Sequence, residues 1–268
     1  MNHQTVSFSK ETNVEFYKTL RSRVNNYFKE NNITRHANAA MVIKTIVMLA
    51  IYLVPFGFLF VSGLSSWVYF VCWAMMGVGM AGVGLSVMHD ANHGAYSRNE
   101  NINKAIGNVL ILLGGSAVNW KIQHNVLHHT YTNVTHLDED IDPPSKLLRF
   151  TPHKKRYAAH KFQHLYAWFF YGLMTFMWFS TKDFKQAVRY KNKDLIKTQG
   201  TTYGRHLSYI ILFKVIYVGL FIVSPFVWSG GSWLVTLLGF LIMHFIAGFI
   251  LSIIFQPAHV VPSSNYPM

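Results

Sequence analysis

Two long runs of the chain contain no charged side chain, and they dominate its hydrophobic pattern. No Asp, Glu, Lys or Arg occurs between Lys44 and Asp90, and none follows Lys214. A helix that crosses a membrane needs about 20 mainly apolar residues, so each run is long enough for two crossings. The turns between the crossings, residues 62–66 and 229–232, are short and uncharged. The pattern therefore predicts two helical hairpins, with spans over residues 41–61, 67–88, 207–228 and 233–255.

Three further segments are apolar or amphipathic but too short to cross a membrane. Residues 105–118 are apolar, which favours a re-entrant or interfacial helix. Residues 165–180 are rich in Trp, Tyr and Phe and are interpreted as an interfacial helix. Residues 16–30 form an amphipathic helix that is expected to pack on the cytosolic domain or to lie at the membrane interface. Its apolar side chains recur at every fourth position: Phe16, Leu20, Val24 and Phe28.

The charged residues set the orientation of these spans. Only 13% of the residues are charged, the net charge is +13 and the mean hydropathy is +0.21. Nearly all Lys and Arg lie in the N-terminal arm and in residues 98–214, and cytoplasmic loops retain positive charge. Both termini and the middle segment are therefore expected in the cytoplasm. The fold class is an all-α membrane protein with four transmembrane helices in two hairpins and a cytosolic helical cap.

The basic charge and the N-terminal arm limit the classes of partner. The charge suits anionic lipid headgroups, phosphate-bearing substrates or an acidic redox partner, whereas no basic motif with a nucleic-acid docking geometry occurs. Residues 1–40 form a polar arm without the apolar core of a signal peptide, and residues 41–268 form the predicted membrane domain. The single cysteine, Cys72, lies within a span, so no disulfide framework is expected.

Five histidines form two clusters that directly follow apolar segments, at the expected membrane edge. Neutral histidine is the commonest metal ligand. Residues four apart share one face of a helix, so His89 with His93, and His124 with His128, are each placed to hold one ion. His129 is rotated by about 100° from His128 and points toward a different position, which a second metal could occupy. The spacing therefore predicts a dinuclear site in the cytosolic cap.

Other polar residues have weaker claims. Four acidic residues follow the second cluster and are expected either to orient its rings or to form a solvated turn before Pro143 and Pro144: Asp138, Glu139, Asp140 and Asp142. Asp90 and Asn92 could orient the first cluster or cap its helix. His244 lies in the middle of a span, where an interhelical hydrogen bond is expected. The remaining cap histidines are interpreted as surface residues: His136, His153, His160, His164 and His206.

The two clusters carry a family resemblance. The segments His89-Asp-Ala-Asn-His93-Gly-Ala-Tyr-Ser97 and Trp120-Lys-Ile-Gln-His124-Asn-Val-Leu-His128-His129-Thr-Tyr-Thr-Asn133 resemble the first two histidine boxes of membrane fatty acid desaturases. The similarity is greatest to the bacterial linoleoyl-CoA, or front-end, type. It covers essentially the whole chain, including Phe255-Gln-Pro-Ala-His259, where the family keeps a histidine after the last span.

The resemblance implies an incomplete ligand set. The family carries a third box, Gln or His followed closely by His-His, beyond the last span, and the sequence ends at Met268 before such a motif. About two or three further ligands would be needed. We therefore expect a C-terminal truncation and an inactive fragment. Six candidate metal ligands remain: His89, His93, His124, His128, His129 and His259.

The chemistry implied by the resemblance is an oxygen-dependent desaturation. Two iron ions would activate O2 and remove two hydrogens from a fatty acyl chain carried by coenzyme A or by a lipid. No heme module precedes the spans, so electrons are expected from an external ferredoxin or cytochrome b5 type donor. The expected location is the bacterial inner membrane. A substrate tunnel is predicted near residues 79–84 and 105–118, where small side chains allow close approach.

Three alternatives remain open. A membrane di-iron lipid hydroxylase would share the site but insert oxygen. A zinc metalloprotease would use His89-Asp90-x-x-His93 with Asp90 as the base, although it leaves His128 and His129 without a role. A non-enzymatic membrane protein could bind a regulatory metal. Metal analysis separates two irons from one zinc.

Overall fold

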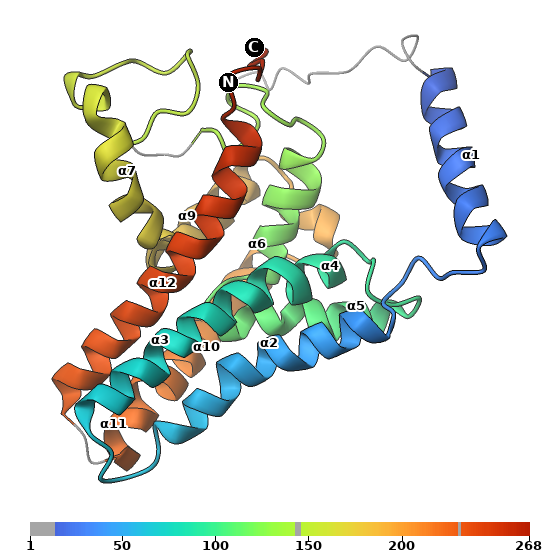
Figure 1. The fold of residues 1–268 in the computed structure, drawn as a ribbon. Coiled ribbons are helices and arrows are strands. Elements are labelled where there is room, and N and C mark those ends of the chain that lie inside the picture. Colours follow the sequence, from blue (N-terminus) through green and yellow to red (C-terminus); the bar gives the residue numbers. More distant parts are fainter. Residues whose placement is uncertain (1–13, 143–145, 230–231) are drawn as a thin grey trace.

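The computed structural model describes residues 14–142, 146–229 and 232–268, and every regular element in these ranges is a helix (Figure 1). The α-helices are α1 (Val14–Glu30), α2 (Ala39–Phe58), α3 (Ser66–Val83), α4 (His89–Asn92), α5 (Glu100–Gly107), α6 (Ala117–Lys121), α7 (Gln163–Gly172), α8 (Met174–Met177), α9 (Asp183–Asn192), α10 (Tyr203–Val218), α11 (Ser224–Ser229) and α12 (Trp233–His259). Short π-helical or 3-10 segments join or extend them: η1 (Gly84–Met88), η2 (Asn108–Leu113), η3 (Ile122–His128), η4 (Ala158–Phe162), η5 (Trp178–Lys182), η6 (Ile196–Gln199) and η7 (Gly219–Val223).

Four helical stretches are long and apolar enough to cross a membrane, which confirms the predicted all-α membrane fold. They cover Ala39–Phe58, Ser66–Asn92, Tyr203–Trp228 and Trp233–His259. Each begins after a residue whose side chain accepts a backbone N–H of the first turn, and these residues are Asn38, Ser65, Thr202 and Ser232. Of the predicted turn over residues 229–232, Gly230 and Gly231 lie outside the described residues.

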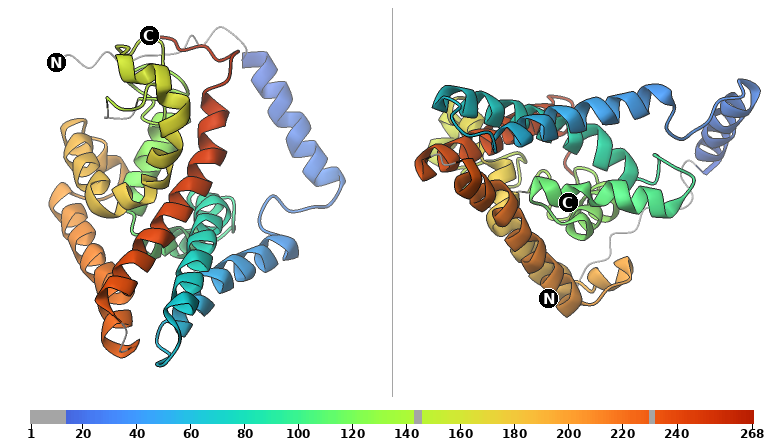
Figure 2. Two further views of the ribbon diagram at one scale, coloured as in Figure 1. Left: turned by 60° about the vertical axis from the view of Figure 1, so that its left-hand side comes forward. Right: turned by 90° about the horizontal axis from the view of Figure 1, so that it is seen from below.

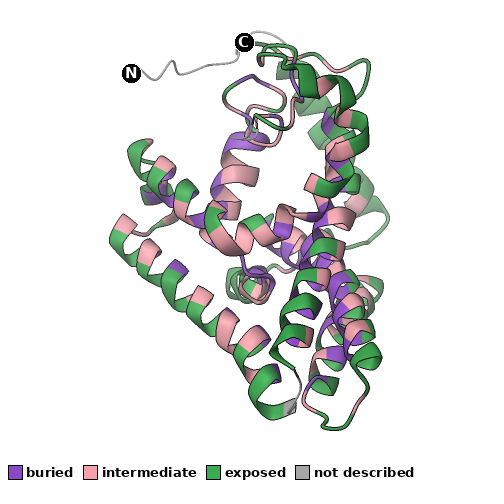
Figure 3. Ribbon diagram, turned by 90° about the vertical axis from the view of Figure 1, so that its left-hand side faces the viewer, coloured by how far each residue is buried: buried purple, intermediate pink, exposed green. Residues whose placement is uncertain are grey.

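Both hairpins turn at the same end of the bundle. In Figures 1 and 2 the connection between α2 and α3 and the start of α12 lie close together, and the C-terminal end of α12 lies at the opposite end. Two hairpins that enter from one face have this arrangement, as the charge pattern predicts. The spans carry exposed residues on their outward faces, and buried residues gather where the helices meet (Figure 3).

Helix α3 is the centre of the bundle. In the most apolar stretch of the span that contains α3, 56% of the residues are buried, whereas in that of α2 only 11% are buried. Added Cβ atoms would meet the backbone of α12 at Gly77 and the backbone of α2 beside Tyr52 at Gly79. Small residues at these positions let the helices approach closely, which is how packing stabilises membrane bundles. A Cβ atom added at Gly84 would contact the side chains of Leu113 and Leu251. These contacts do not outline a tunnel, so the predicted tunnel beside residues 79–84 stays a prediction.

The apolar segment over 105–118 belongs to a sharply bent helical hairpin. Glu100–Leu113 and Ala117–His128 meet at an angle of 110°. Gly114 ends the first arm with φ of +77°, a conformation that glycine adopts without strain. A bend of this size favours the re-entrant interpretation, and we treat the hairpin as one that does not cross the membrane. It brings the second histidine cluster beside the first.

The remaining short segments are also helical. Helix α1 is amphipathic as predicted, but it contains no buried residue and stands apart from the bundle (Figures 1 and 2). Packing on the cap, one of its two expected roles, is therefore not observed. The aromatic segment forms α7, α8 and η5, which pack along α12 through contacts such as Phe169 with Phe245. Its interfacial depth stays a prediction.

Candidate metal centre

All six candidate histidines lie at helix ends or in π-helical segments. The span of α3 continues through the π-helical turn η1 into α4, which carries His89 and ends before His93. The second cluster lies in the π-helical η3, with His129 directly after it. His259 is the last residue of α12. Segments with π-helical geometry occur often at functional sites, because they redirect side chains that an α-helix would place elsewhere.

The six rings form one continuous group. Ring centroids are 4.6 Å apart for His89 and His93, 5.1 Å for His89 and His124, and 5.3 Å for His124 and His128. His259 joins at 4.6 Å from His128. The rings come from three separate elements, α4, η3 and α12, so only the tertiary fold assembles them.

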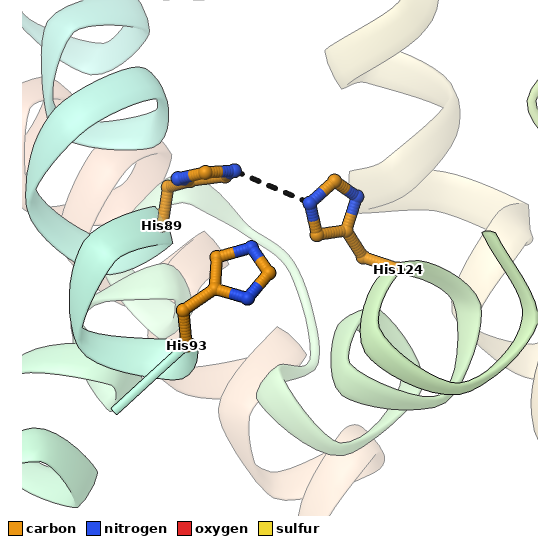
Figure 4. A group of neighbouring side chains, drawn as sticks. All are labelled: His89, His93 and His124. Carbon is orange, nitrogen blue, oxygen red and sulfur yellow. Dashed lines mark hydrogen bonds between the residues drawn. The ribbon is translucent and has the colours of Figure 1, made fainter. Parts of the chain in front are cut away.

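Three sets of side chains within this group have the geometry of a metal site. In each set the ligand atoms all lie within 4.8 Å of one another. The first is His89, His93 and His124, whose rings face one another in Figure 4. The second is His124, His128 and Asp140, and the third is His128, Asp138 and His259. Because neighbouring sets share a histidine, the arrangement suits two adjacent ions better than one.

His129 approaches the first set. Its Nε2 lies 3.3 Å from His124 Nε2, and its ring centroid lies 4.9 Å from that of His93. His124 Nε2 also lies 3.2 Å from His89 Nε2. Three imidazole nitrogens therefore converge on one small volume without a carboxylate among them.

The electrostatics keep this part of the group neutral. Burial, together with the neighbouring His89 and His129 rings, lowers the pKa of His93 to about 4. Burial and the surrounding histidines also hold the pKa of His124 well below its usual value, and that of His129 is lowered for the same reasons. Neutral imidazole is the form that binds metal, so the ring nitrogens are available as ligands at neutral pH.

Asp138 orients the second cluster. Its side chain is fully buried, and its Oδ2 lies 3.1 Å from His128 Nδ1. It also accepts hydrogen bonds from the backbone N–H groups of Asn133 and Asp140. Burial alone would raise the pKa of Asp138, but these hydrogen bonds outweigh burial and lower it. The alternative prediction, a solvated turn, is wrong for Asp138 because this side chain is buried. The two prolines that were expected to follow that turn, Pro143 and Pro144, lie outside the described residues.

The other acids of this segment contact α9 and the cap. Gln123 donates to Asp140 Oδ1 at 2.5 Å, and Gln186 of α9 donates to Gln123 Oε1 at 2.7 Å. Arg189 of α9 pairs with Glu139 at 2.6 Å. Asp142 pairs with Lys154 at 2.6 Å and with His136 at 3.2 Å. The segment after the second cluster is therefore fixed by polar contacts on several sides.

Asn133 and the C-terminal segment hold His259. Asn133 Oδ1 lies 3.2 Å from His259 Nδ1, and its amide donates to the His259 carbonyl. Tyr266 donates to the same carbonyl, and the Pro267 carbonyl accepts from the backbone of Thr135 at 2.8 Å. Asn133 has φ of +60°, and asparagine tolerates this left-handed conformation better than most residues. Asn133 was not among the site residues predicted from the sequence, where its only signal is an asparagine in the turn after the second cluster.

A pair of asparagines joins the two clusters. Asn125 Nδ2 donates to the Asn92 carbonyl at 2.9 Å, and Asn92 Nδ2 donates to the Gly107 carbonyl at 3.3 Å. Asn92 is therefore a link between elements, and the predicted capping role is not observed, since the cap positions of α4 are Met88 and His93. Asp90 Oδ1 lies 3.3 Å from His89 Nδ1, and Lys44 lies 3.7 Å from Asp90 Oδ2. Asp90 thus orients a ring of the first cluster.

Two other histidines bear on the predictions. His206 was expected at the surface, and this is wrong: it is 2% exposed and its Nε2 lies 2.8 Å from Asn119 Oδ1. It lies at the start of a transmembrane helix, where packing against α6 covers it. His244 makes the expected interhelical hydrogen bonds, with Tyr217 and Thr175 at 3.1 Å each.

Comparison with known proteins gives the family. The fatty acid desaturase family model matches residues 65–267, so the chain belongs to the fatty acid desaturase family, whose members are oxidoreductases. It is 30% identical to the sn-1 linoleoyl-lipid 6-desaturase of Arthrospira platensis, over 97% of this chain and 69% of that protein. It is 31% identical to the acyl-lipid (8-3)-desaturase of Physcomitrium patens, over 98% of this chain and 55% of that protein. No solved structure matches.

These matches confirm the predicted resemblance and limit what can be transferred. The chain spans about half the length of the moss relative and 69% of that of the cyanobacterial one. The ligand roles of the six histidines, the expected truncation and the division between residues 1–40 and 41–268 stay predictions. Asp140 and Asp138 are oxygen donors outside the six predicted ligands, and both lie in sets with metal-site geometry.

Replacing Asp138 by asparagine is expected to lower the affinity for iron by about 10–100-fold, the usual effect of losing a group that orients a ligating histidine. The amide keeps the shape but loses the charge that fixes the His128 tautomer. Anaerobic titration of Fe(II) against a competing chelator measures the effect. Asp142→Asn is the matched control, because Asp142 pairs with Lys154 and His136. Equal losses in the two variants would contradict the role of Asp138.

Proposed function

We propose that the chain carries the centre of an oxygen-dependent desaturase that introduces a double bond into a fatty acyl chain at two histidine-held iron ions. The observation that carries this proposal is the run of three overlapping sets of ligand atoms, linked by His124 and His128. It is supported by the family match and by the names of relatives that act on acyl lipids.

The donor set fits iron. The groups offered are imidazole nitrogens and carboxylate oxygens, and Cys72, the only cysteine of the sequence, is buried in α3 and belongs to none of the three sets. Imidazole and carboxylate suit iron, and no thiolate is offered that would favour softer metals. His89, His93, His124 and His129 would hold one ion, and His128, His259 and Asp140 the other. His124 also belongs to the set with His128 and Asp140, so it lies within reach of both positions. When bound, the two irons would supply the dioxygen chemistry that breaks unactivated C–H bonds.

The chain's own residues prepare this site. Asp138 holds the proton on His128 Nδ1 and so directs its Nε2 toward an ion, and Asp90 does the same for His89. Trp120 packs against the first set, with its ring 4.5 Å from His124 and 5.8 Å from His93. Cleavage of an unactivated C–H bond requires that water be excluded and that one pair of methylene groups be positioned. His93 and His129 are exposed in this chain, so bound substrate would have to cover them.

Substrate, electron donor and location follow from the same proposal. The acyl chain is carried by a membrane lipid or by coenzyme A, and electrons come from an external donor of the ferredoxin or cytochrome b5 type. The histidine clusters and both termini face the cytoplasm, on the inner side of a bacterial inner membrane.

The geometry around Asp90 favours a desaturase over a zinc protease, since the Asp90 carboxylate orients His89 and pairs with Lys44.

Two measurements test the proposal. Because this chain is expected to be an inactive fragment, the full-length gene is expressed in a host of known lipid composition, where it is expected to yield new double bonds, detected by mass spectrometry of the acyl chains. Hydroxylated chains would instead indicate the hydroxylase. Metal analysis of the purified full-length protein is expected to give two irons per chain, and one zinc without iron would contradict the proposal.

A further inference from the structure

A basic pocket lies where α1 leads into the first span. It has a volume of about 600 Å³ and is open to solvent. Three cationic side chains line it, Lys29, Arg35 and Arg98, and no acidic side chain does. Three polar side chains, Asn25, Asn32 and Thr34, complete its wall with two apolar ones, Phe28 and Ile33. The lining is thus rich in hydrogen-bond donors beside a small apolar surface.

Within the described part of the chain, none of these three cations makes an ion pair. Arg35 lies 5.8 Å from the centre of the Phe28 ring, another residue of the lining. His36, a further lining residue, has a buried Nδ1 that lacks a hydrogen-bond partner among the described residues. Cations in a concave site focus a positive potential, so the pocket attracts an anion.

The pocket lies directly before the first span, where lipid headgroups are expected. Ala39 begins the first span, and the segment before it is held by the backbone hydrogen bond from Ala37 to Tyr96 at 3.0 Å. Tyr96 precedes Arg98 in the loop that leaves the second span. Residues next to the cytosolic ends of spans meet lipid phosphates, and basic side chains there gain from anionic headgroups.

Helix α1 adds an apolar surface beside the pocket. Phe16, Leu20 and Val24 are 67%, 47% and 46% exposed, and α1 has no buried residue in the protein. An amphipathic helix with exposed apolar side chains and Lys and Arg on its other faces is suited to lie in a membrane interface. A lipid is therefore a better occupant than a soluble anion, because the site is continuous with a surface that lipid would cover.

We propose that the basic pocket binds the phosphate of an anionic membrane phospholipid. Lys29, Arg35 and Arg98 surround the phosphate, and the amide and hydroxyl groups of the lining donate hydrogen bonds to its oxygens. The acyl tails leave along Phe28 and Ile33 toward the interface. This site is separate from the metal centre, and its test requires neither iron nor turnover.

The test uses the full chain purified in detergent. Binding of a fluorescent short-chain phosphatidylglycerol is measured for the triple variant Lys29→Gln/Arg35→Gln/Arg98→Gln. The matched control is Lys18→Gln/Arg21→Gln/Arg23→Gln, which removes the same charge from α1 outside the pocket. We expect the pocket variant to bind at least tenfold more weakly and the control to stay within twofold of the parent. Equal losses, or no loss in either, would overturn the proposal.

Competition distinguishes the source of the phosphate. Unlabelled phosphatidylglycerol is expected to displace the probe more effectively than phosphatidylcholine, inorganic phosphate or coenzyme A. Displacement by coenzyme A at lower concentration than by the lipid would instead assign the pocket to a soluble phosphate ester. The single variant Arg98→Gln, with its thermal midpoint measured alongside, repeats the test if the triple variant does not fold.

Discussion

Replacing His124 by alanine in the full-length enzyme is expected to reduce bound iron from two ions per chain to fewer than one and to abolish the desaturated product. His124 is a member of two of the three sets of ligand atoms, and its Nε2 lies within 3.3 Å of the Nε2 atoms of both His89 and His129. Its loss therefore weakens both ion positions together. Iron content by elemental analysis and the acyl products by mass spectrometry measure the two effects.

The control for this prediction is His136→Ala. His136 also lies in the cap and contacts an aspartate, Asp142, but its side chain is 74% exposed and it belongs to none of the three sets. We expect the His136→Ala variant to keep the iron and the product.

His259→Ala should give an intermediate result, because His259 belongs to only one of the three sets. A loss of about one iron per chain is expected. Unchanged iron content in His124→Ala would contradict the shared role of this residue.

The hydrophobic pattern was sufficient to predict the four spans. The uncharged runs and the positive charge between them reflect the requirements of the membrane. The membrane acts as a solvent on each segment separately, so each span can be predicted from its own composition. The predicted spans agree with the structure to within a few residues at most ends, and the last helix extends to His259. Local composition could not predict the 110° bend of the re-entrant hairpin, which depends on how Gly114 and α10 meet.

The two histidine clusters were also predictable, since spacing on a helix places side chains on a common face. Their environment was not. Asp138 and Asn133 are polar residues of an ordinary-looking turn, and only the fold shows that one is buried against His128 and the other holds His259. His206 was misplaced because its polar neighbours in sequence gave no sign of the packing that covers it.

The second large effect concerns a buried ion pair that holds the re-entrant hairpin. Lys214 of α10 lies 2.6 Å from Asp183, and their side chains are 13% and 6% exposed. Lys214 also donates to the carbonyls of Gly114 and Trp178, and Asp183 accepts from Asn119. Asn119 precedes the second histidine cluster in α6, so the network joins that cluster to a transmembrane helix.

Replacing Lys214 by methionine leaves the Asp183 charge buried without its partner. Removing one member of a buried pair costs about 3–5 kcal/mol of the free energy of unfolding. We expect a clear fall in the thermal midpoint in detergent and a loss of bound iron, because the second cluster loses its support. The double variant Lys214→Met/Asp183→Asn is expected to recover part of the loss, since it also removes the stranded charge. Lys197→Met, which breaks the exposed pair with Asp194, should leave the midpoint unchanged. A double variant no more stable than Lys214→Met would show that the carbonyl contacts of Lys214, rather than its charge, hold the hairpin.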